Sequence, residues 1–231
     1  MKARKILVSV AALALVAALS IAGTLAYLTD KANVTNTFTV GNIQMTLTET
    51  DIKNTNTRTD KGNEYRLYPG QTYTKDPVVT IVKNSEDCYV RMLVEVKNID
   101  QLKAAFPQKD EAGNVIANNA QYYAADGTFL IEKLCGNWDS VNWPCVKVTT
   151  KDVEGVKYAT YEFRYTKVVT NSADDTELPA LFQTITVPEN VDNTALAALG
   201  QVEINIIGNA MQYVGFENNV NGAWTAFEGQ N

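Results

Sequence analysis

The chain has 231 residues, of which 45% are hydrophobic, and its 20 basic and 26 acidic side chains give a formal charge of −6 at pH 7. This acidic balance argues against a basic patch for nucleic acid or anionic lipid. The complete absence of histidine removes the Ser-His-Asp and Cys-His arrangements of nucleophilic catalysis and the H-E-x-x-H motif of zinc peptidases, so we predict no catalytic residues.

The N-terminal segment has the pattern of a secretory signal peptide. Three basic residues precede an uncharged, alanine-rich run over residues 6–26, and small residues gather at its end. The competing interpretation is a retained transmembrane anchor, because the run approaches the ~18 apolar residues that span a bilayer. We favour cleavage, after Ala26 or after Ala22. The expected product is a secreted, extracellular protein that contacts the membrane only before cleavage.

The part of the chain after the signal, residues 27–231, is predicted to form one domain, because β-sandwiches often reach this length as a single unit. Residues 1–26 contain three of the 20 basic residues and none of the 26 acidic ones, which leaves a formal charge of −9 on the domain. Such a surface favours solubility, or binding to cations and basic partners.

Residues 28–40 alternate between apolar and polar side chains, which is typical of a half-buried strand. At Gly41 the alternation shifts by one residue, and apolar residues continue on odd positions up to Leu47. A phase shift at a glycine predicts a bulge or bend between two strand segments. The apolar residues of the first segment all have even numbers: Leu28, Ala32, Val34, Phe38 and Val40.

The remainder of the chain reads as further strands separated by turns. About eight strands in total, with two short helical insertions and a preceding signal helix, predict an all-β fold: an antiparallel β-sandwich of jelly-roll type. A polar, turn-forming stretch over residues 50–64 is predicted to be an exposed loop. Strands are expected within 76–84, 88–98, 142–150, 156–169, 181–190 and 201–216, and helices within 100–107 and 193–200.

Three cysteines remain for an exported chain, so at least one thiol is free or pairs with another molecule. A disulfide between Cys135 and Cys145 could add roughly 3 kcal/mol by restricting the unfolded chain. Three reduced thiols, with Cys88 as the third, are an equal alternative. Trp138 and Trp143 lie inside this loop, either as an exposed contact patch or as a cover for the end of the core, and we favour the cover.

Paired carboxylates occur in three hydrophilic, turn-like stretches. Nothing in these surroundings would raise a carboxyl pKa for acid–base catalysis, so we expect the pairs to solvate loops. No cofactor or metal site is predicted, and calcium binding by residues 171–177 stays open because ligands from separate loops can converge. The pairs are Glu86-Asp87, Asp110-Glu111 and Asp174-Asp175.

The stretch GTLAYLTDKANVTNTFTVGNIQMTL, residues 23–47, resembles the start of the TasA/camelysin family of Gram-positive bacteria. Residues 67–96, with a Pro-Gly turn before two strand-like stretches, are similar to the family's second strand region, and residues 202–224 are like the C-terminal strand of clostridial relatives. The residues that match the family's N-terminal pattern are Gly23, Thr24, Ala26, Tyr27, Thr29, Asp30, Phe38, Gly41, Ile43 and Met45.

The resemblance implies export through a dedicated SipW-type signal peptidase, cleavage between Ala26 and Tyr27, and a jelly-roll subunit that polymerises into biofilm-matrix fibres. In such fibres the N-terminal segment of one copy inserts as a strand into the next, which also suits general physics, because an added strand gains main-chain hydrogen bonds and head-to-tail donation yields open filaments. The expected donor residues are Tyr27, Leu28, Ala32, Val34, Phe38 and Val40.

Three alternatives accompany this expectation. Residues 27–40 could form the first strand of their own sandwich, leaving a monomeric surface or matrix accessory module that binds other matrix proteins or polysaccharide. Some family members are described as camelysin-type metallopeptidases, but this chain departs from any histidine-based zinc site. A zinc site of carboxylates and thiols alone is a poor fit to the sequence.

Overall fold

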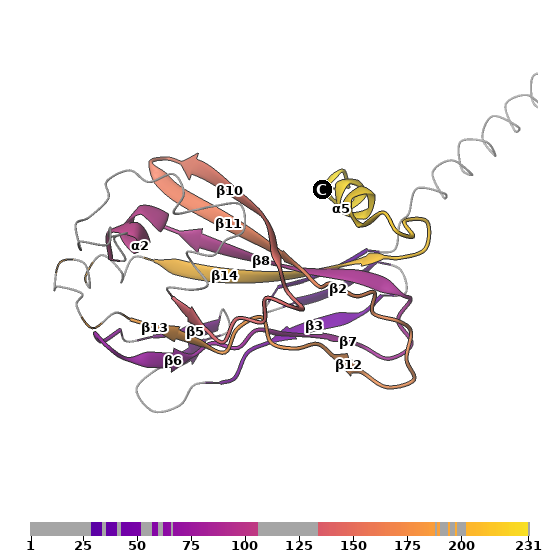
Figure 1. Ribbon diagram of the computed structural model, residues 1–231, viewed down its shortest axis with the longest axis horizontal. Helices are drawn as coiled ribbons and strands as arrows, with labels where there is room; N and C mark the ends of the chain where they lie inside the picture. The colour runs from indigo at the N-terminus through magenta and orange to yellow at the C-terminus, as the bar shows by residue number, and fades with distance from the viewer. Residues whose placement is uncertain are drawn as a thin grey trace, which may run out of the picture.

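Two layers of antiparallel strands face each other across a hydrophobic core (Figure 1). The computed structural model describes residues 29–33, 36–40, 43–51, 57–59, 62–65, 67–105, 134–187, 189, 194, 197 and 202–230. One layer is a six-stranded sheet in the order β10-β11-β8-β14-β1-β2. Its strands are β1 (Thr29–Asn33), β2 (Asn36–Val40), β8 (Cys88–Lys97), β10 (Cys145–Val153), β11 (Val156–Arg164) and β14 (Glu203–Gln212).

The opposite layer consists of two three-stranded sheets, ordered β12-β7-β3 and β6-β13-β9. Backbone hydrogen bonds continue between them, from Lys75 N to Gln183 O (3.0 Å) and from Leu181 N to Pro77 O (3.1 Å). Pro77 has no N–H to give to a ladder, which accounts for the interruption between β6 and β7. The strands are β3 (Met45–Thr48), β6 (Thr72–Thr74), β7 (Val78–Ile81), β9 (Cys135–Gly136), β12 (Thr176–Glu177) and β13 (Thr184–Thr186).

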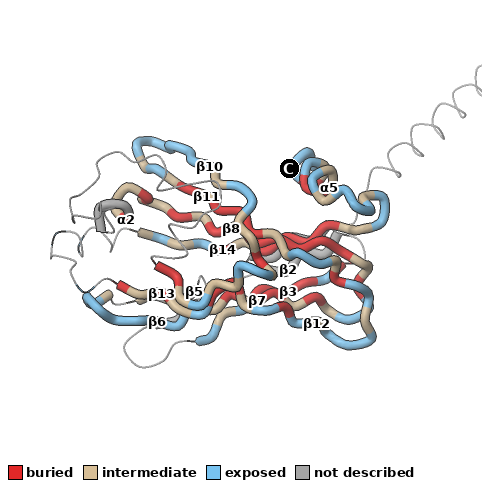
Figure 2. Tube along the Cα trace, viewed as in Figure 1, coloured by how far each residue is buried: buried red, intermediate tan, exposed pale blue. Residues whose placement is uncertain are grey.

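Strict alternation along the long strands creates the core. In β8 the even-numbered side chains face the opposite layer and are almost fully buried (Figure 2). The same holds for the inward side chains of β11 and of the opposite strands, so the predicted all-β antiparallel sandwich is confirmed. Core side chains with 1% exposure or less include Met45, Val79, Val90, Met92, Val94, Val96, Tyr161, Phe163 and Ile206.

The phase shift predicted at Gly41 separates two strands that belong to different layers. β2 ends at Val40 in the six-stranded sheet, and β3 begins at Met45 beside β7 in the other layer. When the chain moves from one layer to the other, the side chains that point into the core must change. The shift of apolar residues from even to odd positions indicates this change.

Two regions depart from the sequence-based prediction. Residues 50–64, expected to be a loop, contain a short two-stranded hairpin of β4 (Thr57–Thr59) and β5 (Gly62–Glu64). The sequence pattern predicted no element after residue 216, and the resemblance grouped residues up to 224 with a C-terminal strand, but the chain forms helix α5 (Val220–Glu228). Both were missed because three-residue polar strands and a nine-residue helix give weak local signals.

The helix predicted over 100–107 is present as α2 (Ile99–Ala105). Ile99 and Leu102 close one end of the core, while Asp100 lies in the first turn and pairs with Lys157 at 2.8 Å. Most of the second predicted helix, 193–200, lies outside the described residues, as does the signal segment 1–26. In the part of the chain that the structure describes, no helix is long and apolar enough to cross a membrane.

Candidate functional site

The N-terminal hairpin lies at the edge of the six-stranded sheet. β1 pairs antiparallel with β14, from Thr29 opposite Met211 to Asn33 opposite Ile207. β1 also pairs with β2, which forms the outermost strand. On its other side β14 pairs with β8 along ten positions, so β14 is the strand that joins the hairpin to the interior of the sheet.

The structure describes two strands where the sequence indicated one. The predicted donor residue Ala32 lies in β1, and Phe38 and Val40 lie in β2. Ala32 is opposite Thr37 and Phe38 is opposite Lys31, so positions 32 and 38 fall on different faces of the hairpin. The apolar stripe is therefore divided by a reversal between Asn33 and Asn36, residues of a type that favours turns. The other predicted site residues, Ala26, Tyr27, Leu28 and Val34, lie outside the described residues.

Helix α5 covers the outer face of the six-stranded sheet, on the side away from the core (Figure 1). Asn219 caps its N-terminus, with the side-chain oxygen accepting a hydrogen bond from Gly222 N at 3.0 Å. Ala223, Trp224 and Phe227 are buried against Tyr89 of β8 and Met211 of β14. This cluster is separate from the main core, so α5 is attached to the sandwich by a small interface of its own.

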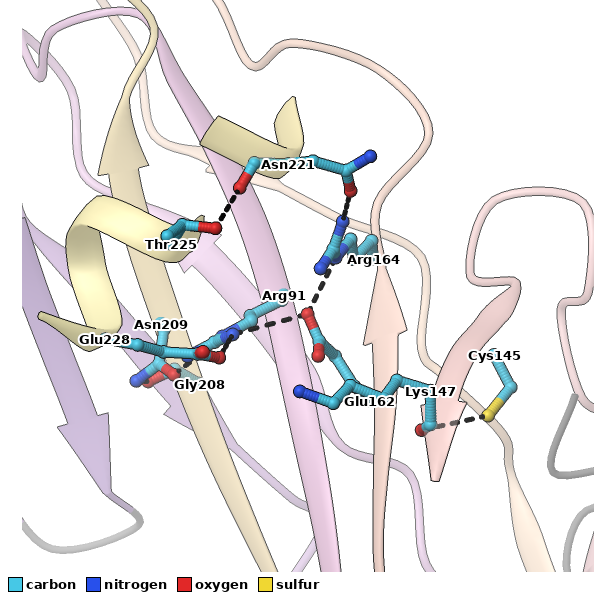
Figure 3. Close-up of polar contacts among 10 residues, drawn as sticks. All are labelled: Arg91, Cys145, Lys147, Glu162, Arg164, Gly208, Asn209, Asn221, Thr225 and Glu228. Carbon is cyan, nitrogen blue, oxygen red and sulfur yellow. Dashed lines mark hydrogen bonds and ion pairs between the residues drawn. The ribbon is translucent and has the colours of Figure 1, made fainter. Parts of the chain in front are cut away.

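Arg91 of β8 lies beneath α5 and is only 3% exposed. Its Nε donates to Asn209 Oδ1 of β14 at 3.1 Å, and its Nη1 donates to Glu162 Oε1 of β11 at 3.3 Å and to Glu228 Oε1 of α5 at 2.9 Å (Figure 3). A buried charge is tolerated only when it is paired and hydrogen-bonded. One guanidinium therefore ties three strands of the sheet to the C-terminal helix.

Aromatic rings of α5 complete the surroundings of Arg91. The guanidinium carbon lies 4.4 Å from the ring centroid of Trp224 and 5.2 Å from that of Phe227. Cation–π contacts of this kind strengthen when they are shielded from water. The indole Nε1 of Trp224 is itself buried and has no hydrogen-bond partner among the described residues, which lowers the stability of the docked helix.

A second arginine shares the Glu162 carboxylate. Arg164 Nε donates to Glu162 Oε1 at 2.7 Å, and Arg164 Nη1 donates to Asn221 Oδ1 of α5 at 2.5 Å (Figure 3). Together with Glu228, the cluster balances two positive charges with two negative ones. All of these groups are engaged with one another, so the arrangement fastens the helix and offers no free nucleophile or base.

Sequence reasoning missed both α5 and the role of Arg91. The available signal was local: Asn219 is a good N-cap, Gly229 follows the last turn, and Val220, Ala223, Trp224 and Phe227 have helical spacing. Arg91 gave no comparable signal, because the outward face of β8 is mixed in character and only the docked helix buries it.

None of the three cysteines forms a disulfide in the structure, which is the reduced alternative rather than the Cys135–Cys145 disulfide. Burial raises the pKa of the Cys88 thiol to about 12, with a further contribution from the Asp87 charge. Burial also raises the pKa of the Cys135 thiol to about 12, against the opposing charge of Lys75. Neither group is a nucleophile at neutral pH, because reactivity requires the thiolate.

The tryptophans of the 135–145 loop turn inward and cover the end of the core, as predicted. Trp143 is fully buried, and its Nε1 donates to Pro179 O at 2.8 Å. Trp138 Nε1 donates to Trp143 O at 2.9 Å, and its ring meets Phe163 edge-on at 6.2 Å. An exposed aromatic contact patch at this loop is therefore ruled out.

Two of the predicted carboxylate pairs come together, because the turn before β8 packs beside the loop before β12. Asp87 Oδ1 accepts from Asn171 N at 2.7 Å, and Asp175 Oδ1 accepts from Lys83 N at 2.9 Å. These carboxylates thus stabilise the loops by accepting hydrogen bonds from backbone N–H groups. Among the described residues, no three or more Asp, Glu or Cys side chains are placed to hold a metal ion. Asp110-Glu111 lies outside the described residues.

Residues 2–76 match the family model described as camelysin metallo-endopeptidase. The match includes the predicted signal segment, the edge hairpin and the strands up to β6. The comparison with curated proteins gave no match, and neither did the comparison with solved structures. The match supports the resemblance to the TasA/camelysin family over the N-terminal third of the chain.

Proposed function

We propose that this protein is a secreted structural subunit of an extracellular or biofilm matrix, and that it assembles into fibres by exchange of its N-terminal hairpin. A SipW-type signal peptidase would cleave it between Ala26 and Tyr27, two positions before β1 begins at Thr29. The observation that carries the proposal is the place of the hairpin at the open edge of the main sheet, where β14 is the only described strand that pairs it with the rest of the sheet.

Exchange would preserve the bonding seen within one chain. The hairpin of one copy would leave its own β14 and occupy the same register on β14 of the next copy, so each β1–β14 ladder would be replaced by an identical one. Donation from one end of a subunit to the next is a heterologous contact that does not close on itself, and it produces filaments. Before cleavage the segment preceding β1 is tethered, which limits the reach of the hairpin.

The decisive experiment is electron microscopy of purified residues 27–231 at increasing concentration, with no tag before Tyr27. We expect uniform filaments. Phe38→Asp should prevent their formation and leave a folded monomer whose hairpin is undocked, because a carboxylate in β2 opposes docking on the sheet of a partner and on that of its own chain alike. Thr46→Asp, an exposed position on β3, is the matched control and should still assemble.

A deletion distinguishes exchange from a purely internal role of the hairpin. A chain lacking residues 27–36 should remain folded by circular dichroism and fail to polymerise. If this deletion unfolds the sandwich, the segment belongs to its own core and donation is wrong.

The closed hairpin itself favours a second candidate, a monomeric accessory protein that binds a matrix partner or polysaccharide. In the structure β1 already pairs within its own chain, so a stable monomer needs no exchange. A monomer that persists across a range of salt and calcium concentrations would select this candidate over the fibre subunit.

We also propose that the chain is not a peptidase, despite the description of the family model. A zincin-type site needs imidazole ligands, and the chain has no histidine. The Asp, Glu and Cys side chains of the described residues form no ligand group either. Stoichiometric zinc in the purified protein, together with chelator-sensitive hydrolysis of casein, would overturn this part of the proposal.

A further inference from the structure

We propose that α5 is a latch that controls how fast the N-terminal hairpin leaves β14. The inference rests on the proposed exchange for its functional consequence, while the coupling between the latch and the hairpin can be measured without assembly. It concerns the two ends of the chain, which the sheet brings together around one segment of β14, residues 207–211.

The pairing register places the helix and the hairpin on the same rows of the sheet. Asn209 of β14 lies between Arg91 of β8 and Lys31 of β1. In the next row Met211 lies between Tyr89 of β8 and Thr29 of β1. The β14 and β8 members of both rows are the residues on which α5 is built.

The contacts of α5 restrain residues 207–211 of β14, the segment with which the hairpin pairs. Met211 is fully buried under α5, and Asn209 is held by Arg91, whose other partners include Glu228 of the helix. With α5 docked, this part of β14 is held by the helix on the outer face of the sheet as well as by its pairing with β8. Local opening requires the loss of packed contacts, so a segment fixed on two sides opens less often than one fixed on a single side.

The contacts of α5 nevertheless allow the helix to undock from the sheet. Its apolar cluster is distinct from the main core, so undocking leaves the interior of the sandwich intact. Trp224 Nε1 has no hydrogen-bond partner in the described part of the chain, and the Glu228 side chain that pairs with Arg91 is 52% exposed. A short amphipathic helix has little stability of its own, so α5 is ordered mainly by this interface.

The latch acts on the rate of exchange and not on its equilibrium. The β1–β14 ladder and the α5 contacts are the same whether β1 comes from the same chain or from a second copy. Their free energies therefore cancel between the closed and exchanged forms. Release of the hairpin is the step that they oppose, and anything that undocks α5 would start assembly.

Phe227→Ala in the full chain after cleavage tests the coupling, with amide hydrogen exchange as the measurement. We expect exchange at residues 29–33 and 207–211 to accelerate by about tenfold or more, while the β3–β7 ladder of the opposite layer keeps its protection. Thr225→Ala, on the exposed side of the same helix, is the matched control and should change neither region. Glu228→Gln, which removes the charge but keeps the shape, should give a smaller acceleration, about two- to threefold.

Three results would overturn the latch. Equal acceleration in both layers would show that α5 supports the whole fold, and unchanged exchange at 29–33 would show that the helix and the hairpin are independent. Filaments that form at the wild-type rate in Phe227→Ala would remove α5 from the exchange pathway. A wild-type chain that forms no filaments would instead refute the proposed function, and the hydrogen-exchange result would still decide whether the latch exists.

Discussion

The six-stranded sheet ends in a hairpin at each edge, and the two hairpins differ in how firmly they are attached. β10 and β11 are nine residues each, and β11 supplies three fully buried side chains to the core. β1 and β2 have five residues each, and the hairpin meets the sheet along the five pairs between β1 and β14. The β10–β11 hairpin is therefore longer and contributes side chains to the core, whereas the N-terminal hairpin joins the sheet through one short ladder.

The outer strands of these hairpins also differ in their protection against an added strand. β10 carries Lys147 and Lys151 and has a register shift between Cys145 and Lys147, and both features discourage edge pairing. β2, with the sequence NTFTV, has neither a charged residue nor a proline. The β10 edge is therefore poorly suited to strand addition, and this difference supports our proposal that the N-terminal hairpin is the element that exchanges.

The largest effect should come from removing the core contribution of the β10–β11 hairpin. Phe163→Ala deletes a fully buried ring that packs edge-on against Trp138. We expect the free energy of unfolding to fall by about 3–5 kcal/mol in urea titrations. A loss below about 1 kcal/mol would mean that this hairpin, too, is only attached to the sheet.

A slightly smaller loss in the free energy of unfolding is expected at Arg91. Its side chain links Glu162 of β11 to Asn209 of β14, the strand that pairs with β1. Arg91→Met leaves the buried Glu162 paired with one arginine and removes the hydrogen bond to Asn209. We expect the free energy of unfolding to fall by about 3 kcal/mol in the same titration. Arg164→Met is the comparison variant. Its side chain is more exposed (17% against 4%), so its loss should be clearly smaller; equal losses would contradict the central role of Arg91.

The buried thiols make the stability of the sandwich depend on pH. The pKa values of Cys88 and Cys135 are about 12 when folded, against an ordinary 9.0, so between these values the unfolded chain loses thiol protons that the folded chain keeps. Stability from this source is complete below pH 9 and falls as pH rises towards 12.

Denaturant unfolding at pH 8 and pH 10 measures this effect. Between pH 8 and pH 10 the free energy of unfolding should fall by about 1.4 kcal/mol less in Cys88→Ala than in wild type. Above pH 9 one buried thiol contributes about that amount for each pH unit. Native alkylation with iodoacetamide at pH 8 should also modify the half-buried Cys145 of β10 before the other two. An identical pH dependence in both proteins would show that Cys88 is not held as a buried thiol.

The smallest effect is expected at the turn of the β10–β11 hairpin. Gly155 has φ of +82° and Glu154 has φ of +54°, and nothing lies within 4 Å of a Cβ added at Gly155. Gly155→Ala should therefore cost only the backbone strain of the left-handed region, about 1 kcal/mol. Gly155→Asn should cost less, because asparagine tolerates this region, and a larger loss for Asn than for Ala would contradict this explanation.

Much of the fold followed from local pattern. The even-numbered stripe of β8, the inward face of β11 and the change of phase at Gly41 all predicted which side of which strand is buried. Trp138 and Trp143 were also placed correctly over the end of the core. The candidate site was predicted less well, because the reversal between Asn33 and Asn36 turned one expected strand into a hairpin, and α5 was not foreseen.

The sequence by itself determined the β-sandwich class and the facing of the long strands, because alternation along a strand is a property of the nearest neighbours in the chain. Only the tertiary structure decided that Arg91, Glu162, Asn209 and Glu228 form one cluster, and that the two ends of the chain share a segment of β14. These contacts join residues far apart in the chain, and their charges are stable only once the docked helix excludes water. No local pattern contains that information.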